Sequence, residues 1–188
     1  MEQAITHKDK NNWYTYFQLG CTYTAEESFT KAMDYFNKSL EIQKSPWAYY
    51  GKAIVCQKTG DKEGASKNIR YAYELKSNDI SLAKDLFKIL FVNNENNLII
   101  SYYEDADESI KANKRCSIYY AYALALTGRL KESEDILCGK ENLVIPDIRE
   151  CETITSDLWF YIQSQKNNNS SEELPKELDF RMFVQRDN

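Results

Sequence analysis

The chain has 188 residues, enough for one domain that buries roughly 70% of its unfolded surface. Hydrophobic residues make up 43% and charged residues 28%, a composition that is typical of a folded globular domain and excludes an intrinsically disordered chain. The formal net charge of −5 argues against nucleic-acid binding, which needs a basic surface, and no run approaches the roughly 18 apolar residues of a membrane span.

The first residues, 1–12, form a polar leader without the apolar core of a signal peptide. The five cysteines are widely spaced and never arranged as C-x-x-C, which favours reduced thiols over disulfides or a zinc site. We therefore expect a cytoplasmic protein. His7 is the only histidine and lies in the leader, so histidine-dependent catalysis has no suitable residue. We predict no catalytic residue, no metal site and no cofactor.

From residue 13 onward the same residue types return at a period of about 34 residues. Gly60 and Gly128 lie 68 residues apart, which is two periods. We place the first residues of successive repeats at 13, 46, 80, 114 and 148, each repeat being a helix, a short turn and a second helix. Small residues predominate where the two helices must approach closely, at Gly20, Ala53, Phe87 and Ala121 in the first helix and at Ala32, Ala65, Ile99 and Ser133 in the second.

Two prolines mark the starts of predicted helices, because proline is tolerated in the first turn. Pro46 precedes a helix that begins at Trp47, and Pro146 precedes a long C-terminal helix that runs from Asp147 to Gln163. No alternation of apolar and polar residues indicates a strand.

Beyond this helix the composition becomes polar, which predicts a flexible connector over residues 165–176. The tail, residues 177–188, contains the apolar residues Leu178, Phe180, Met182, Phe183 and Val184. We expect the tail to dock on the last repeat and to cover its exposed face.

The period and the helix-turn-helix pattern resemble tetratricopeptide repeats (TPRs). This resemblance implies an all-α fold: a TPR-like right-handed superhelix, or α-solenoid, of about four helical hairpins plus the long C-terminal helix and the docked tail. The helical repeat domain would extend over residues 13–164. Its function would be that of a non-catalytic scaffold that binds a peptide or protein partner in a concave groove.

Several segments also resemble the C-terminal repeat region of bacterial proteins of unknown function that carry a β-rich domain similar to carbohydrate-active folds. These segments are residues 45–49, 145–150, 157–160, 174–175 and 178–182. The resemblance implies an alternative function, an accessory repeat module that packs against such a β-rich domain.

In TPR proteins the first helix of each repeat lines the concave surface, and repeat positions 2, 5, 9 and 12 point into it. Carried onto this chain, those columns predict a partner-binding groove formed by Tyr14, Phe17, Trp47, Tyr50, Lys84, Lys88, Phe91, Arg115, Tyr122, Arg149, Glu152 and Trp159. An aromatic half adjoins a basic half, which suits a peptide with bulky apolar side chains and one or two carboxylates.

Two alternatives remain open for these residues. The aromatic side chains can instead be core residues packed between neighbouring helices. The polar residues near the last helix, Arg149, Glu150, Glu152 and Asp157, form either a ligand site or a structural ion-pair network.

Overall fold

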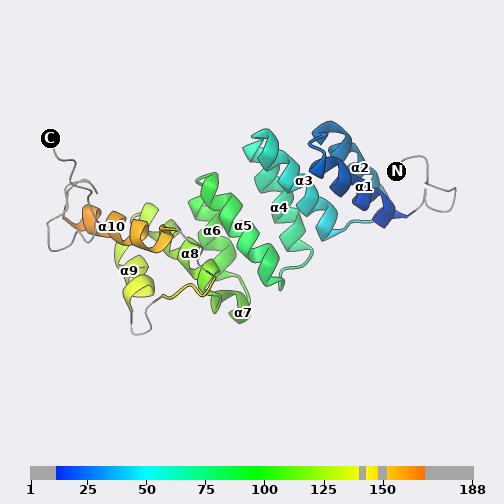
Figure 1. Ribbon diagram of the computed structural model, residues 1–188. Coiled ribbons are helices and arrows are strands. Elements are labelled where there is room, and N and C mark those ends of the chain that lie inside the picture. Colours follow the sequence, from blue (N-terminus) through cyan, green and yellow to red (C-terminus); the bar gives the residue numbers. More distant parts are fainter. Residues whose placement is uncertain (1–11, 140–142, 148–151, 168–188) are drawn as a thin grey trace, which may run out of the picture. The chain divides into compact units, whose positions relative to one another are not determined.

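The computed structural model describes residues 12–139, 143–147 and 152–167, and every regular element in these ranges is an α-helix (Figure 1). The helices are α1 (Trp13–Ala25), α2 (Phe29–Ile42), α3 (Pro46–Thr59), α4 (Lys62–Glu74), α5 (Ile80–Val92), α6 (Asn96–Glu104), α7 (Glu108–Lys111), α8 (Lys114–Leu126), α9 (Leu130–Cys138) and α10 (Ile154–Lys166). The predicted all-α fold, an α-solenoid built from helical hairpins, is confirmed.

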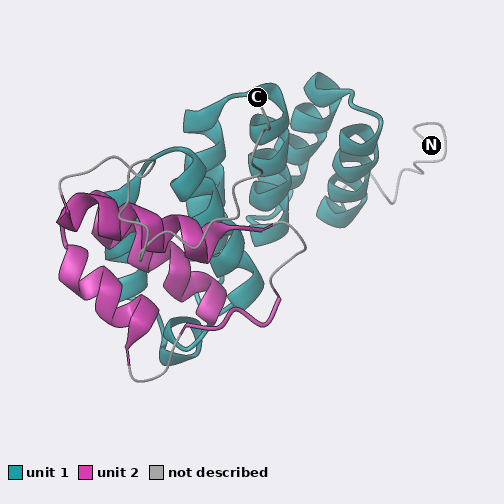
Figure 2. Cartoon of the chain, turned by 60° about the vertical axis from the view of Figure 1, so that its left-hand side comes forward, with its two compact units in different colours: residues 1–113 teal, residues 114–188 magenta. Residues whose placement is uncertain are grey.

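The helices pair in chain order, α1 with α2, α3 with α4, α5 with α6 and α8 with α9, and α10 follows as a single helix. We call the first helix of each pair the A helix and the second the B helix. Contacts divide the chain into two compact units, residues 1–113 (unit 1) and residues 114–188 (unit 2) (Figure 2). The short α7, which the repeat pattern did not predict, follows the third hairpin and contacts α5.

Each hairpin reverses direction at one residue in the left-handed backbone conformation. These residues are Glu27 (φ 57°), Gly60 (φ 77°), Asn94 (φ 60°) and Gly128 (φ 88°). They are 33, 34 and 34 residues apart, which are the steps of the predicted register. Glycine adopts this conformation without steric cost and asparagine tolerates it, whereas glutamate is poorly suited to it. The period in the sequence therefore corresponds to a repeated chain reversal.

Short polar side chains fix the starts of three helices in unit 1. The side-chain oxygen of Asn12 accepts a hydrogen bond from the Tyr14 amide (3.0 Å). Asp61 accepts from the Gly64 amide (2.9 Å), and Asp79 accepts from the Ser81 and Leu82 amides (2.9 and 3.1 Å). These N-caps satisfy amides that have no partner inside the helix and so position α1, α4 and α5.

The buried ring of Phe36 on α2 joins the first two hairpins. It packs where two glycines remove the side chain, Gly20 on α1 and Gly51 on α3. A Cβ atom at Gly20 would lie 2.6 Å from this ring, and one at Gly51 would lie closer still. The expected close approach at Gly20 is therefore present, and Gly51, which the repeat columns did not single out, provides a second one.

The C-terminal helix begins later than predicted. The predicted start was Asp147, but α10 starts at Ile154, and Asp147 lies in a turn. Leu143 and Ile145 are two residues apart and both reach the core of unit 2, a spacing that suits extended backbone better than a helix. The Asp147 carbonyl also accepts a hydrogen bond from the Arg115 side chain (2.8 Å) instead of a helical one.

Several predictions fall outside the described residues. The polar leader is described only at Asn12, and α10 extends through residues 165 and 166 of the expected connector. The rest of the connector and the tail, residues 177–188, lie outside the described ranges, as do Arg149 and Glu150.

We expect Gly20→Leu to destabilise the chain by about 1–3 kcal/mol, because the new side chain would compete with the Phe36 ring for the same space. Chemical unfolding gives the change in free energy, and hydrogen exchange should locate it in the N-terminal hairpins. Phe36→Leu should restore part of the loss in the double variant. A stability equal to that of the wild type would contradict the close packing at Gly20.

Candidate functional site

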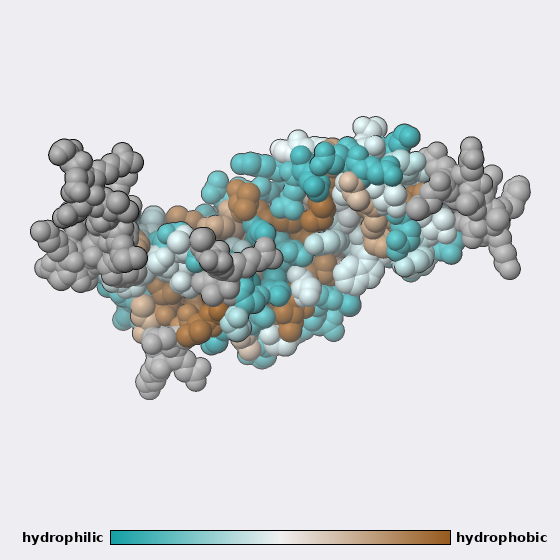
Figure 3. Space-filling view, viewed as in Figure 1, coloured by the Kyte–Doolittle hydropathy of each residue, from teal (hydrophilic) through white to brown (hydrophobic). Residues whose placement is uncertain are grey.

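The A helices of unit 1 carry exposed aromatic side chains at equivalent repeat positions. Tyr14 on α1 and Trp47 on α3 are 51% and 38% exposed, and the two helices are in contact. Figure 3 views this side of unit 1, where hydrophobic residues lie over α5 and between α5 and α3, beside hydrophilic residues. We call this surface the A-helix face of unit 1 and define it by Tyr14, Trp47, Tyr50, Lys84 and Lys88.

Trp47 is linked to the start of α5 through a lysine. The Lys76 ammonium lies 4.9 Å from the centre of the Trp47 ring and forms a 2.7 Å ion pair with Asp79, the N-cap of α5. The hydrogen bond from Lys76, together with that from the Leu82 amide, lowers the pKa of Asp79. The indole is thus held in place while a large part of its surface stays in contact with solvent.

Phe17, by contrast, belongs largely to the core. Its ring centre is 6.1 Å from that of Phe36 and 6.1 Å from that of Tyr14. It packs against the cluster of buried residues that contains Phe36 and Val55. Phe17 therefore supports the exposed Tyr14 ring from beneath and offers less of its own surface to a partner.

Tyr50 connects α3 to α5 through Asp85. Burial raises the pKa of Tyr50 to about 12, and the charge of Asp85 and a hydrogen bond with it act in the same direction. Asp85 was missed by the sequence analysis because it lies outside the four groove columns, although it directly follows Lys84. The predicted basic half of the groove therefore contains one carboxylate, which is occupied by the Tyr50 hydroxyl.

The remaining predicted residues of unit 1 lie on α5. Lys88 is exposed, whereas Lys84 and Phe91 are half-buried. Lys84 and Lys88 are four residues apart, so that they lie on the same side of the helix. The face thus combines aromatic surface from α1 and α3 with positive charge from α5.

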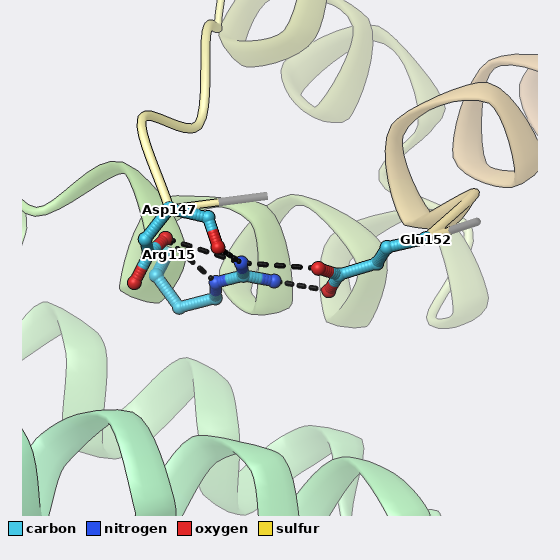
Figure 4. Close-up of polar contacts among 3 residues, drawn as sticks. All are labelled: Arg115, Asp147 and Glu152. Atoms are coloured by element: carbon cyan, nitrogen blue, oxygen red, sulfur yellow. Dashed lines mark hydrogen bonds and ion pairs between the residues drawn. The ribbon is translucent and has the colours of Figure 1, made fainter. Parts of the chain in front are cut away.

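In unit 2, Arg115 of α8 is held between two acidic residues (Figure 4). Its guanidinium donates to the Asp147 carboxylate (Nε, 3.1 Å), to the Asp147 carbonyl (Nη2, 2.8 Å) and to both carboxylate oxygens of Glu152, one of them from Nη2 at 3.1 Å. The Arg115 side chain is only 12% exposed. Arg115 thus joins the first turn of α8 to the loop before α10.

The electrostatics of this site stabilise the charged form of Arg115. Burial alone would lower its pKa, but the hydrogen bond with Glu152 and the charges of Asp147 and Glu152 outweigh burial and raise the pKa above its ordinary value. Of the polar set near the last helix, Glu152 belongs to this ion-pair network, while Asp157 accepts a hydrogen bond from the Thr153 hydroxyl (2.8 Å).

Tyr122 and Trp159 lie at the packing contact between α8 and α10. Both are half-buried and pack against the core of unit 2, which includes Ile118 and Leu158. Burial raises the pKa of Tyr122 to about 12, with smaller contributions from Asp157 and Tyr161. These two aromatic residues contribute to the interior of unit 2.

The described ranges contain no group of three or more His, Cys, Asp or Glu side chains that could hold a metal ion. Among the helices of those ranges, none has the length and apolar character needed to cross a membrane.

Comparison with known proteins supports the TPR character of the fold. Residues 14–46, which include nearly all of the first hairpin, match the family model of the tetratricopeptide repeat. The structure is similar to the crystal structure of YrrB, described as a TPR protein with an unusual peptide-binding site, with a TM-score of 0.67 and 17% sequence identity over 94% of this chain and 87% of that one. No curated protein matches the sequence.

These matches define the class of protein as a TPR-like helical-repeat chain. The narrower resemblance to bacterial proteins with a β-rich, carbohydrate-active-like domain finds no support in them.

We expect Arg115→Met to destabilise the chain by about 1–3 kcal/mol, because it leaves the partly buried Glu152 without its cation and frees the loop before α10. Arg129→Met is the matched control, since Arg129 forms an exposed ion pair with Glu132 on α9 that we expect to contribute less than about 1 kcal/mol. Denaturant unfolding measures both changes, and equal effects of the two substitutions would contradict the structural role of Arg115.

The raised pKa of Tyr50 makes its contribution to stability dependent on pH. Because the neutral phenol is favoured in the folded state, this contribution is complete below about pH 10 and is lost as the pH rises through about 12. A tyrosinate absorbance titration of the wild type should show this late ionisation. Tyr50→Phe should remove it, and Tyr71→Phe, at an exposed tyrosine, should not. A titration unchanged by Tyr50→Phe would argue against the contact with Asp85.

Proposed function

We propose that the chain is a non-catalytic interaction scaffold that binds a peptide or protein partner on the A-helix face of unit 1. The observation that carries the proposal is the exposure of two large aromatic side chains, Tyr14 and Trp47, at equivalent positions of successive A helices. Exposed, rigidly held aromatic rings are the side chains most often found at the energetic centre of interfaces. The similarity to YrrB, whose peptide-binding site is part of its description, supports the same class of function.

The charge of the A helices indicates the chemistry of the partner. Helix α1 has no charged side chain, whereas α3 and α5 together carry four lysines and one acidic residue, Asp85. This positive balance contrasts with the net charge of −5 of the whole chain. A face of this kind attracts a ligand with carboxylates and orients it, while aromatic surface supplies most of the affinity. The favoured partner is therefore an acidic segment with bulky apolar side chains.

Unit 2 contributes to this proposal in a different way. Its predicted groove residues Arg115 and Glu152 bind each other, and Tyr122 and Trp159 pack against the core. We assign these four residues to the support of the fold and place the partner on unit 1. Arg149, which completes the predicted set, lies outside the described residues.

The alternative is an accessory module packed against a β-rich domain, with a fixed apolar surface around Trp47, Trp159 and Phe180. Trp159 is half-buried against the core of unit 2. Phe180 lies outside the described residues. No specific observation favours this alternative over the scaffold.

Peptide libraries displayed against the immobilised full-length chain test whether the face binds at all. From an acidic aromatic sequence selected in this way, a matched peptide with amides in place of carboxylates is made, and both affinities are measured by fluorescence anisotropy. We expect Trp47→Ala to weaken both peptides. Failure to select any peptide, or selection that is indifferent to Trp47→Ala, would contradict the proposed site.

Lys84→Glu combined with Lys88→Glu should weaken the acidic peptide by about tenfold or more, leave the amide peptide nearly unaffected and leave folding intact. The control is Lys62→Glu with Lys67→Glu, which makes the same change of charge at exposed positions of the B helix α4. Equal losses in the two double variants would reflect overall charge and would remove α5 from the site.

A further inference from the structure

Helix α10 is buried on two opposite sides. Leu158 and Ile162 belong to the core cluster of unit 2, to which α8 and α9 contribute. Phe160 and Ser164 are also buried, with exposed fractions of 6% and 3%. Phe160 is two residues from both Leu158 and Ile162, which places it about 200° around the helix from each of them. A buried residue there requires a cover on the outer side of the helix.

The core of unit 2 does not account for this cover. Ile154, Trp159 and Tyr161 pack against the same cluster as Leu158, whereas Phe160 is outside it. Phe160 contacts Trp159 edge to face, with ring centres 5.2 Å apart, but one neighbouring ring on the same helix cannot bury both Phe160 and Ser164. The occupant of the outer side must supply apolar surface for a phenyl ring.

We propose that the C-terminal segment 177–188 covers the Phe160 side of α10. This segment supplies Leu178, Phe180, Met182, Phe183 and Val184, an aromatic and aliphatic set suited to a phenyl ring and the small Ser164 beside it. The inference concerns unit 2 and does not depend on the peptide-binding proposal for unit 1.

The length of the chain allows this arrangement. The ten residues from Asn167 to residue 177 can span up to about 35 Å. Phe160 lies six residues before the end of α10, which is about 9 Å along the helix. The segment can therefore turn back along α10 and reach Phe160 with length to spare. Its polar preceding residues, 167–173, suit a solvated connection.

This cover has a consequence for how the repeat array ends. In a stacked array the outer side of the last helix is the surface that a further repeat, or a second copy of the chain, would contact. A segment of the same chain on the Phe160 side closes that surface. The chemistry that fits the site is thus a short apolar and aromatic peptide, supplied in cis.

The test uses the full-length chain. Phe180→Asp with Phe183→Asp should lower Tm by roughly 5 °C and increase hydrogen exchange in α10, because the cover is lost. The matched control, Gln185→Asp with Asn188→Asp, adds the same charge to polar positions of the tail and should leave both measurements unchanged. Phe160→Ala should also lower Tm.

A double-mutant cycle isolates the contact. In the Phe180→Asp, Phe183→Asp background, Phe160→Ala should cost less than half of the Tm loss that it causes in the wild type, because the ring is already uncovered. Full additivity of the two changes would overturn the proposal. So would a second copy as the occupant, seen in sedimentation as a dimer that Phe160→Ala dissociates and the tail substitutions do not affect. Peptide binding to unit 1 should be unchanged throughout, which separates this test from the previous one.

Discussion

The contact of one phenyl ring with two glycines determines how the first half of the structure is built. Phe36 lies on a B helix, yet it is buried between the A helix of its own hairpin, at Gly20, and the A helix of the next, at Gly51. A single hairpin cannot enclose this ring, so burial of Phe36 requires both hairpins together. The same contact brings α1 and α3 side by side, which is what places Tyr14 and Trp47 on one surface. The stability of the array and the geometry of its proposed binding face therefore depend on the same packing.

Unit 2 uses polar interactions for a similar purpose. The segment between α9 and α10 is longer than the connections in unit 1, and Arg115 holds it through Asp147 and Glu152. An arginine can bind two carboxylates and a carbonyl at once because its donors point in fixed directions. Leu143 and Ile145 add apolar contacts from the same segment. A residue that the sequence suggested for partner binding is thus part of the structure that positions the last helix.

The fold was largely predictable from the sequence because its signals are local and repeated. The hairpin turns recur at Gly60 and Gly128, and the small residues at Gly20, Ala53 and Ala121 follow the same period. What could not be predicted depends on contacts between distant residues. Gly51 has the Phe36 ring as its neighbour, Asp85 has the Tyr50 hydroxyl, and Arg115 has the loop before α10. Pro146 correctly indicated a change of backbone, but the burial of Leu143 and Ile145, and not local propensity, decides that no helix follows at once.

The four left-handed residues also indicate where this chain can change in length during evolution. Their spacing differs only between the first and second hairpins, by one residue, and the connections between successive hairpins are where the chain varies, with three residues before α3 and five before α5. Deletion of one residue inside a helix would rotate every later side chain on it by about 100° and would move Trp47 or Lys88 off the shared face. Insertions and deletions should therefore be tolerated in these connections and selected against within the helices.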